Sequence, residues 1–498
     1  MSHVPSDQLQ SGLFRLPREL RDEIYAHYLL EEDGYFYDFE SRRMLRNSDT
    51  VSNELKANEP TSKELVPRSS ALSLTCRRAA DELRWVALRT DSVTFIPGYS
   101  EHYEGEYKGI KSRAGRFECL LKYVQVTKMD IMVYAKKLLT PEILGEIETR
   151  YPGLSKHFRA PLTAASMEEQ GSFDTQWFLP NLFNNDEFGL ALSIDFHDAL
   201  QFALELIRGH DHFDQLAKKA LEPLPPKTLQ HVNMDNRRHR NLFSATSLST
   251  ILDWHPAPWA IPSDTELSSI EQLLTEPKPK AECIVLADTF QYTERDLDFS
   301  RGFEGVRWHF SACAVTLGFL KLYPPQKLRR IKIREDCKSV SYPERHFQAL
   351  GFYMKENPSL RIEVHIGPWM NMLPVGWEGI MDRRNVNGSI SGDCALLVFA
   401  TWLGELIKLP SHGLPADRVL VILEGQCSMS LELWDKMKQA AGLQEAMIRL
   451  SHEQGLELPH YQADPQAQAR RTAQYFRLPC HLPDAFSRWS KTSSKGGP

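Results

Sequence analysis

Two short segments near the N-terminus carry hydrophobic residues at helical spacing. In GLFRLPRELRDEIYAHYLL, residues 12–30, Leu20, Ile24 and Tyr28 recur every four residues and so share one face of a helix. Pro17 suits the first turn of that helix, where a missing N–H costs nothing. Tyr25 and Leu29 lie beside the apolar face. The residues that we expect to face water are Arg18, Arg21, Asp22 and Glu23.

The second segment, ALSLTCRRAADELRWVALRTDSVTFI at 71–96, repeats this one-sided pattern. Its apolar stripe consists of Leu72, Cys76, Ala79, Ala80, Leu83 and Ala87. Its polar face consists of Arg77, Arg78, Asp81, Glu82 and Arg84. Burying one Leu or Ile stabilises a protein by about 1.5 to 3 kcal/mol, and two short helices cannot fully cover each other. We therefore expect the stripes to pack either on the body of this chain or on a partner.

Strand patterns follow the second helix. DSVTFIP at 91–97 alternates as a short strand does, and LLKYVQVTKMDIMV resumes a strand pattern from Leu120. The region from about 135 to 280 mixes helical pieces with proline-rich connections such as LEPLPPKT and WHPAPWAIPSD. We expect irregular structure in this middle region.

From residue 281 the chain alternates between strands and helices. The predicted strands are ECIVLADTF, KLRRIKIRED, LRIEVHIG and RVLVILEG. The predicted helices are HFSACAVTLGFLKLY, ERHFQALGFYMKEN, CALLVFATWLGELIKL and LELWDKMKQAAGLQEAMIRL. This alternation indicates a mostly parallel sheet with helices packed on it.

Two of the predicted strands have the apolar phase of a leucine-rich-repeat strand. They are Leu121, Val124 and Val126 in the first, and Leu328, Ile331 and Ile333 in the second. The strands are unevenly spaced, so a strict repeat period is absent. We expect an irregular, curved α/β layer, with a doubly wound sheet as the competing topology.

Composition and charge restrict the class of protein. The 498 residues carry 59 Lys and Arg against 65 Asp and Glu, a formal net charge of -6, which does not attract nucleic acid. The eight cysteines are scattered and never approach C-x-x-C spacing, as in a reducing compartment. The N-terminus lacks a signal-peptide pattern, and the longest apolar run, at 394–403, is too short to span a bilayer. We therefore expect a cytoplasmic or nuclear location.

The N-terminal residues resemble a known domain. Leu16-Pro17-x-Glu19-Leu20-x-x-x-Ile24, followed by LSLTCRR at 72–78, is similar to the F-box, and in particular to the F-box-like domains of filamentous fungi. The related fungal domain with two Glu-x-Arg motifs is similar too, through Glu19-Leu20-Arg21 and Glu82-Leu83-Arg84. The resemblance covers residues 12–96, and residues 31–70 interrupt its two halves, which an ordinary F-box joins almost directly.

The resemblance implies a function in protein recruitment. An F-box binds the adaptor Skp1 of cullin-RING ubiquitin ligases, while a C-terminal domain, often of leucine-rich repeats, holds the substrate. The positions that match the adaptor-facing apolar residues are Leu16, Pro17, Leu20, Ile24, Leu74 and Cys76. Catalysis would belong to the ligase partners.

A basic strand offers a second candidate surface. In KLRRIKIRED, Arg330 and Lys332 alternate with the core-facing residues, and Arg334 continues the row. Such a row could hold an acidic or phosphorylated segment through charge-assisted hydrogen bonds. The alternative, which we favour because surface charge is common, is a solvated strand face balanced by nearby acids.

Two patterns suggest chemistry less strongly. In DFHDALQFALELIRGHDHFD, His197 and His210 flank a helix and so lie about 20 Å apart, too far to share a metal ion. In RVLVILEGQCSMSLELW, Cys427 follows a strand and begins a helix, like a nucleophile elbow, although Met429 replaces the second glycine. A buried structural cysteine is the simpler interpretation. We expect no catalytic residue, metal or cofactor.

Together these patterns predict an α+β to α/β chain. A small N-terminal helical F-box-like module spans 12–97 with an inserted loop at 31–70, and an irregular α/β segment spans 98–280. A leucine-rich-repeat-like α/β body spans 281–451, and a tail spans 452–498. The leading hypothesis is a non-catalytic substrate receptor of a Skp1-cullin-F-box ligase that binds a Skp1-like adaptor and an unknown protein, without nucleic acid or membrane. The alternatives are a stand-alone interaction scaffold and a hydrolase that uses Cys427.

Overall fold

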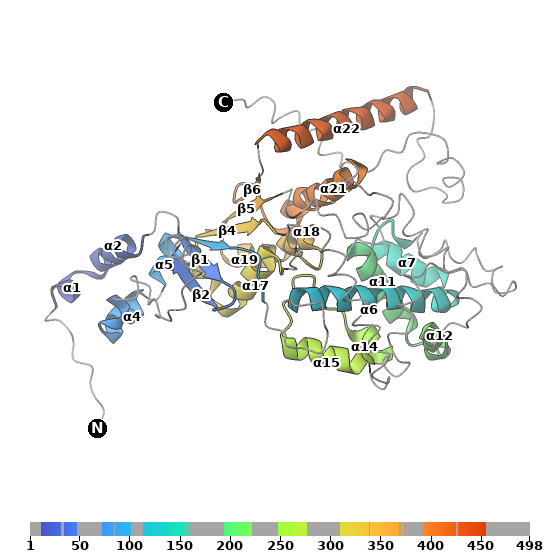
Figure 1. The fold of residues 1–498 in the computed structure, drawn as a ribbon, viewed down its shortest axis with the longest axis horizontal. Coiled ribbons are helices and arrows are strands. Elements are labelled where there is room, and N and C mark those ends of the chain that lie inside the picture. Colours follow the sequence, from blue (N-terminus) through green and yellow to red (C-terminus); the bar gives the residue numbers. More distant parts are fainter. Residues whose placement is uncertain are drawn as a thin grey trace, which may run out of the picture.

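A six-stranded sheet forms the centre of the computed structural model (Figure 1). The structure describes residues 11–30, 34–46, 72–83, 85–100, 113–155, 158, 194–221, 248–275, 309–337, 339–367, 371, 392–424 and 427–454. The strand order is β2-β1-β3-β4-β5-β6. The strands are β1 (Tyr35–Asp38), β2 (Arg43–Arg46), β3 (Ser92–Phe95), β4 (Arg330–Glu335), β5 (Arg361–Ile366) and β6 (Val419–Leu423). Only the β1–β2 pair is antiparallel; β1, β3, β4, β5 and β6 are parallel neighbours.

Helices cover one face of this sheet. They are α17 (Ala312–Leu322), α18 (Pro343–His346), α19 (Leu350–Glu356), α21 (Gly392–Lys408) and α22 (Cys427–Glu453), with the short helices η7 (Pro325–Lys327), η8 (Phe347–Ala349) and η10 (Leu409–His412). Alternate residues of the strands, such as Val93, Ile331 and Val364, pack with α17, α19 and α21 in one core. The residues between them, such as Thr94, Lys332 and Glu363, belong to no core cluster of the described residues.

The order of the strands explains why the helices lie on one face. Within the described part of the chain, the parallel strands follow one another in sequence order, and crossovers of one hand then place the connecting helices α17, α19 and α21 on the same side. A doubly wound sheet would reverse its strand order, and these strands show no reversal. The predicted α/β character is confirmed, as are the strands at β3, β4, β5 and β6. The strand expected in ECIVLADTF lies outside the described residues.

The strand predicted from Leu120 is wrong, because residues 113–135 form the helix α6 (Arg113–Ala135). This helix is buried on most of its sides, with Phe117, Leu120, Val124, Lys128 and Ile131 among its buried residues, so its apolar positions show no clear one-sided period. A helix that is buried on most sides can carry β-branched residues at positions that also fit a strand. The phase shared by Leu121, Val124 and Val126 is therefore not that of a leucine-rich-repeat strand.

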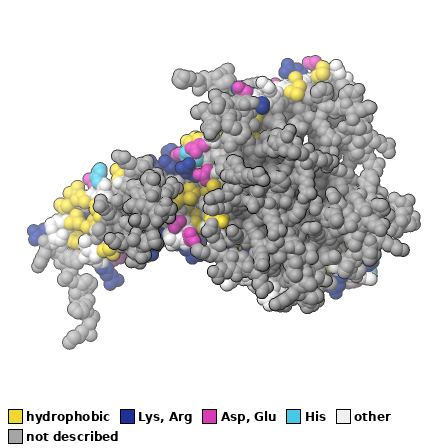
Figure 2. Space-filling view, viewed as in Figure 1, with side chains coloured by type: hydrophobic (Ala, Val, Ile, Leu, Met, Phe, Trp, Pro, Cys, Tyr) yellow, Lys and Arg dark blue, Asp and Glu magenta, His cyan; other side chains and the backbone are white. Residues whose placement is uncertain are grey.

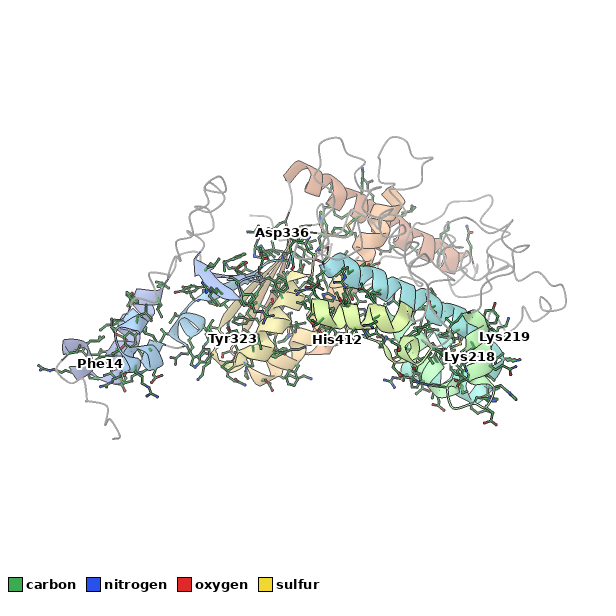
Figure 3. All side chains as sticks on the ribbon, turned by 60° about the horizontal axis from the view of Figure 1, so that its bottom comes forward. Phe14, Lys218, Lys219, Tyr323, Asp336 and His412 are labelled. Carbon is green, nitrogen blue, oxygen red and sulfur yellow. The ribbon has the colours of Figure 1, made fainter. Side chains whose placement is uncertain are left out.

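Helix α6 organises a separate helical layer. It packs against α11 (Ile194–Ile207), α12 (Phe213–Ala220), α14 (Leu248–Asp253) and α15 (Asp264–Thr275). The short η3 (Lys136–Leu138) and α7 (Pro141–Arg150) follow it. These helices share one hydrophobic core, which is distinct from the core under the sheet. In Figure 3, Lys218 and Lys219 lie at the far end of this layer from the N-terminal helices.

The segment between the two N-terminal helical patterns contributes to the sheet. Strands β1 and β2 both lie within residues 31–70, and Tyr35 of β1 pairs in parallel register with Val93 of β3. Strand β3 in turn pairs with β4. The sheet therefore takes strands from both sides of the boundary that we placed at residue 97, while the domain division itself stays a prediction.

One close approach in the body can be tested by mutation. A Cβ added at Gly351 of α19 would lie 1.8 Å from the backbone oxygen of His412 in η10, whereas one added at Gly145 of α7 would meet nothing within 4 Å. Gly351→Ala should lower the free energy of unfolding by roughly 1 to 3 kcal/mol, because backbone must move. Gly145→Ala should raise it by about 0.5 to 1 kcal/mol. Urea unfolding of both variants checks this, and equal effects would contradict the close approach.

Candidate functional site

The N-terminal helices form a small bundle at one end of the molecule (Figures 1 and 3). They are α1 (Gly12–Arg15), α2 (Arg18–Leu29), η2 (Leu72–Leu74), α4 (Arg77–Leu83) and α5 (Val86–Thr90). Their core consists of Phe14, Tyr25, Leu29, Ala79, Leu83 and Val86. The two helical segments therefore pack partly on each other, whereas we expected their stripes to pack on the body of the chain or on a partner. This leaves the question of which face of α2 is covered.

A buried ion pair fixes the covered face of α2. The Arg21 guanidinium donates two hydrogen bonds of 2.8 Å to the two carboxylate oxygens of Glu82 in α4. The Tyr25 hydroxyl donates a third, also 2.8 Å. Arg21 and Glu82 are only 5% and 8% exposed, so the prediction that they face water is wrong. Their partnership was invisible in the sequence because 61 residues separate them.

The groups around Glu82 shift its pKa, so the ionisation of this carboxylate is linked to folding. Burial alone would raise the pKa of Glu82, but the hydrogen bonds from Arg21, Tyr25 and Arg78 outweigh it and lower that pKa to about 2. Burial and the contact with Glu82 raise the pKa of Tyr25 to about 12. Arg18 also reaches Glu82, at 3.3 Å. One carboxylate thus gathers donors from both helices, and it joins the arginine of the first Glu-x-Arg motif to the glutamate of the second.

The neighbouring side of α2, about 100° around the helix axis, presents an apolar ridge. Leu20, Ile24 and Tyr28 are 46%, 42% and 40% exposed, and their four-residue spacing places them along one face. The covered face carries Arg21, Tyr25 and Leu29 at the same spacing. Figure 2 shows hydrophobic side chains gathered on the surface over α1 and α2. The ridge is thus not sealed within the described part of the chain.

The six residues predicted to face an adaptor fall into two groups. Pro17, Leu20, Ile24 and Leu74 are exposed, and Leu74 is the most exposed of them at 72%. Leu16 and Cys76 are half-buried. Cys76 packs on the small core, and its sulfur accepts a hydrogen bond from the Ala79 amide at 3.3 Å, so it also caps the start of α4.

The basic strand residues lie on the sheet face opposite the helices, which the described residues leave uncovered and which is called the uncovered face below. Arg330 and Arg334 are exposed, and Lys332 is half-buried. Arg334 lies 3.9 Å from Asp336 and 4.0 Å from Glu424, so it has acidic neighbours. The pairing of β4 with β5 places Arg361 directly opposite Arg330. Arg361 was missed from the sequence, because only the register of two strands that are distant in sequence reveals it.

The proposed hydrolase site falls mostly outside the described residues. Cys427 is the first residue of α22, but its side chain lies outside the described residues, and so do Gly425 and Gln426. His197 is buried in α11, and the ring of His210 lies tilted beside that of His212, with centroids 5.8 Å apart. Within the described ranges, no group of three or more His, Cys, Asp or Glu could hold a metal ion, and no helix is long and apolar enough to cross a membrane.

Comparisons of the chain with protein-family models, with curated proteins and with solved structures found no match.

The pH dependence of stability tests the Glu82 contact. Because the folded pKa of about 2 lies below the ordinary value of 4.5, Glu82 stabilises the fold above pH 4.5 and loses this effect as the pH falls toward 2. Glu82→Gln should therefore lower the melting temperature at pH 7, and its difference from wild type should shrink between pH 4.5 and 2. Thermal unfolding at a series of pH values measures this.

Glu19→Gln is the matched control, because Glu19 is exposed on α2. Its melting temperature should follow that of the wild type at every pH. A Glu82→Gln difference that stays constant down to pH 2 would contradict the role given to the carboxylate.

Proposed function

We propose that the protein is a non-catalytic interaction protein that docks a Skp1-like adaptor through the ridge of Leu20, Ile24 and Tyr28. In this proposal it acts as a substrate receptor of a Skp1-cullin-F-box ligase, and its α/β body holds a partner protein. The observation that carries the proposal is the exposure of the ridge on a helix whose other face is already fixed. The proposal includes a cytoplasmic or nuclear location, which the scattered cysteines favour.

The fixed face matters because it prevents α2 from burying the ridge by rotating. Such a rotation would carry Arg21 away from Glu82 and leave a carboxylate unpaired in a site where it is only 8% exposed. The ridge can therefore be covered only by another surface. Covering Leu20 and Ile24 would contribute about 1.5 to 3 kcal/mol for each fully buried side chain, an upper bound because both are partly covered already.

The module is also held firmly against the sheet. Val86 of α5 lies in the core of the N-terminal bundle, and Leu88 of the same helix lies in the core under the sheet. The Tyr35 hydroxyl of β1 donates a 2.7 Å hydrogen bond to the carbonyl of Leu29 at the end of α2. Trp85 packs edge-on against Tyr323 of α17, with ring centroids 6.4 Å apart. An adaptor on α2 would thus have a defined position relative to a partner on the body, as a receptor requires.

The stand-alone scaffold remains the rival hypothesis. It shares the exposed ridge but assigns it a partner other than a Skp1-like adaptor. The hydrolase hypothesis stays a prediction that rests on Cys427 alone, and labelling by a thiol-reactive probe at neutral pH tests it.

Substitution of the ridge tests adaptor docking. Leu20→Asp with Ile24→Asp should weaken co-purification with Skp1 roughly hundredfold or more, because charged groups would be buried at the centre of the contact. The melting temperature of the free chain should change little, since both side chains are exposed.

The control is Glu19→Gln with Glu23→Gln, two exposed positions of the same helix. This variant should bind as the wild type does. Wild-type protein that fails to bind Skp1 in a purified system would exclude the ligase hypothesis and leave the scaffold. Unimpaired binding by the ridge variant would exclude the ridge as the docking site.

A further inference from the structure

The uncovered face of the sheet has a basic end and an acidic end. The cross-strand neighbours on β4 and β5 are, from the amino to the carboxyl end, Arg330 with Arg361, Lys332 with Glu363, and Arg334 with His365. Figure 2 shows charged and histidine side chains on the surface where Figure 1 places β4, β5 and β6. This face is therefore accessible, at least in part, from solvent.

The acidic end is internally paired. His365 lies between two carboxylates, 2.5 Å from Glu363 and 2.5 Å from Glu424. Arg334 lies within 4.0 Å of Asp336 and of Glu424. Carboxylates outnumber the permanent cation at this end, so it would repel an anion and attract a basic side chain.

The basic end has no such partners. Arg330 and Arg361 are both exposed and lie directly opposite each other, on strands about 4.8 Å apart. No described residue forms an ion pair or a side-chain hydrogen bond with either guanidinium. Like charges placed opposite each other destabilise a sheet. Lys332 continues the positive row about 6.6 Å further along β4, and it lies directly opposite Glu363, the first carboxylate of the acidic end.

We propose that this basic end binds an extended acidic segment of a partner protein, with its Asp or Glu side chains on Arg330, Arg361 and Lys332. Alternate side chains of an extended chain are about 6.6 Å apart, which matches the spacing of Arg330 and Lys332. Basic residues further along the segment then meet the carboxylates at the other end of the sheet. The partner segment is thus bipolar, acidic in one half and basic in the other.

Carboxylates fit this surface better than a phosphate group does. A phosphate is bound most tightly where several donors, including free backbone N–H groups, converge on one point. Here the backbone groups of β4 and β5 are used in the ladder between the strands, and the positive charges are spread in a row. A row of single negative charges is the complementary arrangement.

This inference rests on the proposed function as an interaction protein, because it specifies the chemistry of the partner that the α/β body holds. It does not depend on the ridge of α2. Binding at the sheet and binding of the adaptor can therefore fail separately.

A fluorescent peptide of twelve residues tests the inference with the full chain. One half carries Glu at three alternate positions and the other half carries Lys at two. The comparison peptide has the same composition with Glu and Lys interspersed. Fluorescence anisotropy at low salt should show that the wild type binds the bipolar peptide at least about fivefold more tightly.

Arg361→Glu gives two readouts at once. It places a carboxylate opposite Arg330, so it should weaken binding of the bipolar peptide roughly tenfold while keeping or raising the melting temperature. Lys355→Glu is the matched control, because it makes the same charge change at an exposed position on α19, a helix of the covered face. It should leave binding unchanged.

Three results would overturn the inference. They are equal binding of the two peptides, wild-type affinity in Arg361→Glu, and tighter binding of a phosphoserine peptide than of the Glu peptide through the same arginines. The Leu20→Asp and Ile24→Asp variant should bind the bipolar peptide as the wild type does. Wild-type protein that binds the bipolar peptide but fails to bind the adaptor would refute the proposed ligase function alone.

Discussion

The contact between Arg21 and Glu82 determines the orientation of α2, and the orientation of α2 determines what the N-terminal module presents. A bidentate guanidinium–carboxylate pair has a fixed geometry, and Tyr25 adds a hydrogen bond from the next turn of the helix. Because breaking such a buried pair leaves an uncompensated charge, the helix has one rotational position. Leu20 and Ile24 are outside as a direct consequence.

The same reasoning connects the module to the body. Helix α5 contributes Val86 to the core of the N-terminal bundle and Leu88 to the core under the sheet, so this short helix joins the two cores. The sheet adds β1 and β2 from the segment that interrupts the resemblance to an F-box. That segment is thus partly a structural element of the sheet, which gives a physical reason for its position between the two helical patterns.

Sequence periodicity predicted the local elements better than their partners. The apolar stripe of Leu20, Ile24 and Tyr28 and the strands β4 and β5 followed from spacing alone, since these elements have a clear period. The sequence misled where a helix is buried on most sides: the segment from Leu120 has β-branched residues at strand-like positions and no one-sided apolar stripe to mark it as a helix.

Long-range contacts could not be predicted at all. Arg21 and Glu82 both read as surface charges, because nothing local marks a charge that has a distant partner. Arg361 became a candidate only when strand register placed it opposite Arg330. These residues determine which side chains of α2 are exposed and which charges face each other across β4 and β5.

Solvent footprinting of the full chain with and without a Skp1-like adaptor tests the central claim most directly. Radical labelling followed by mass spectrometry reports the accessibility of Leu20, Ile24 and Tyr28 side chain by side chain. The account predicts that Leu20 and Ile24 are labelled in the free chain and protected in the presence of the adaptor, while Tyr25 is unlabelled in both. A ridge that is already protected in the free chain, or whose labelling the adaptor does not change, would contradict it.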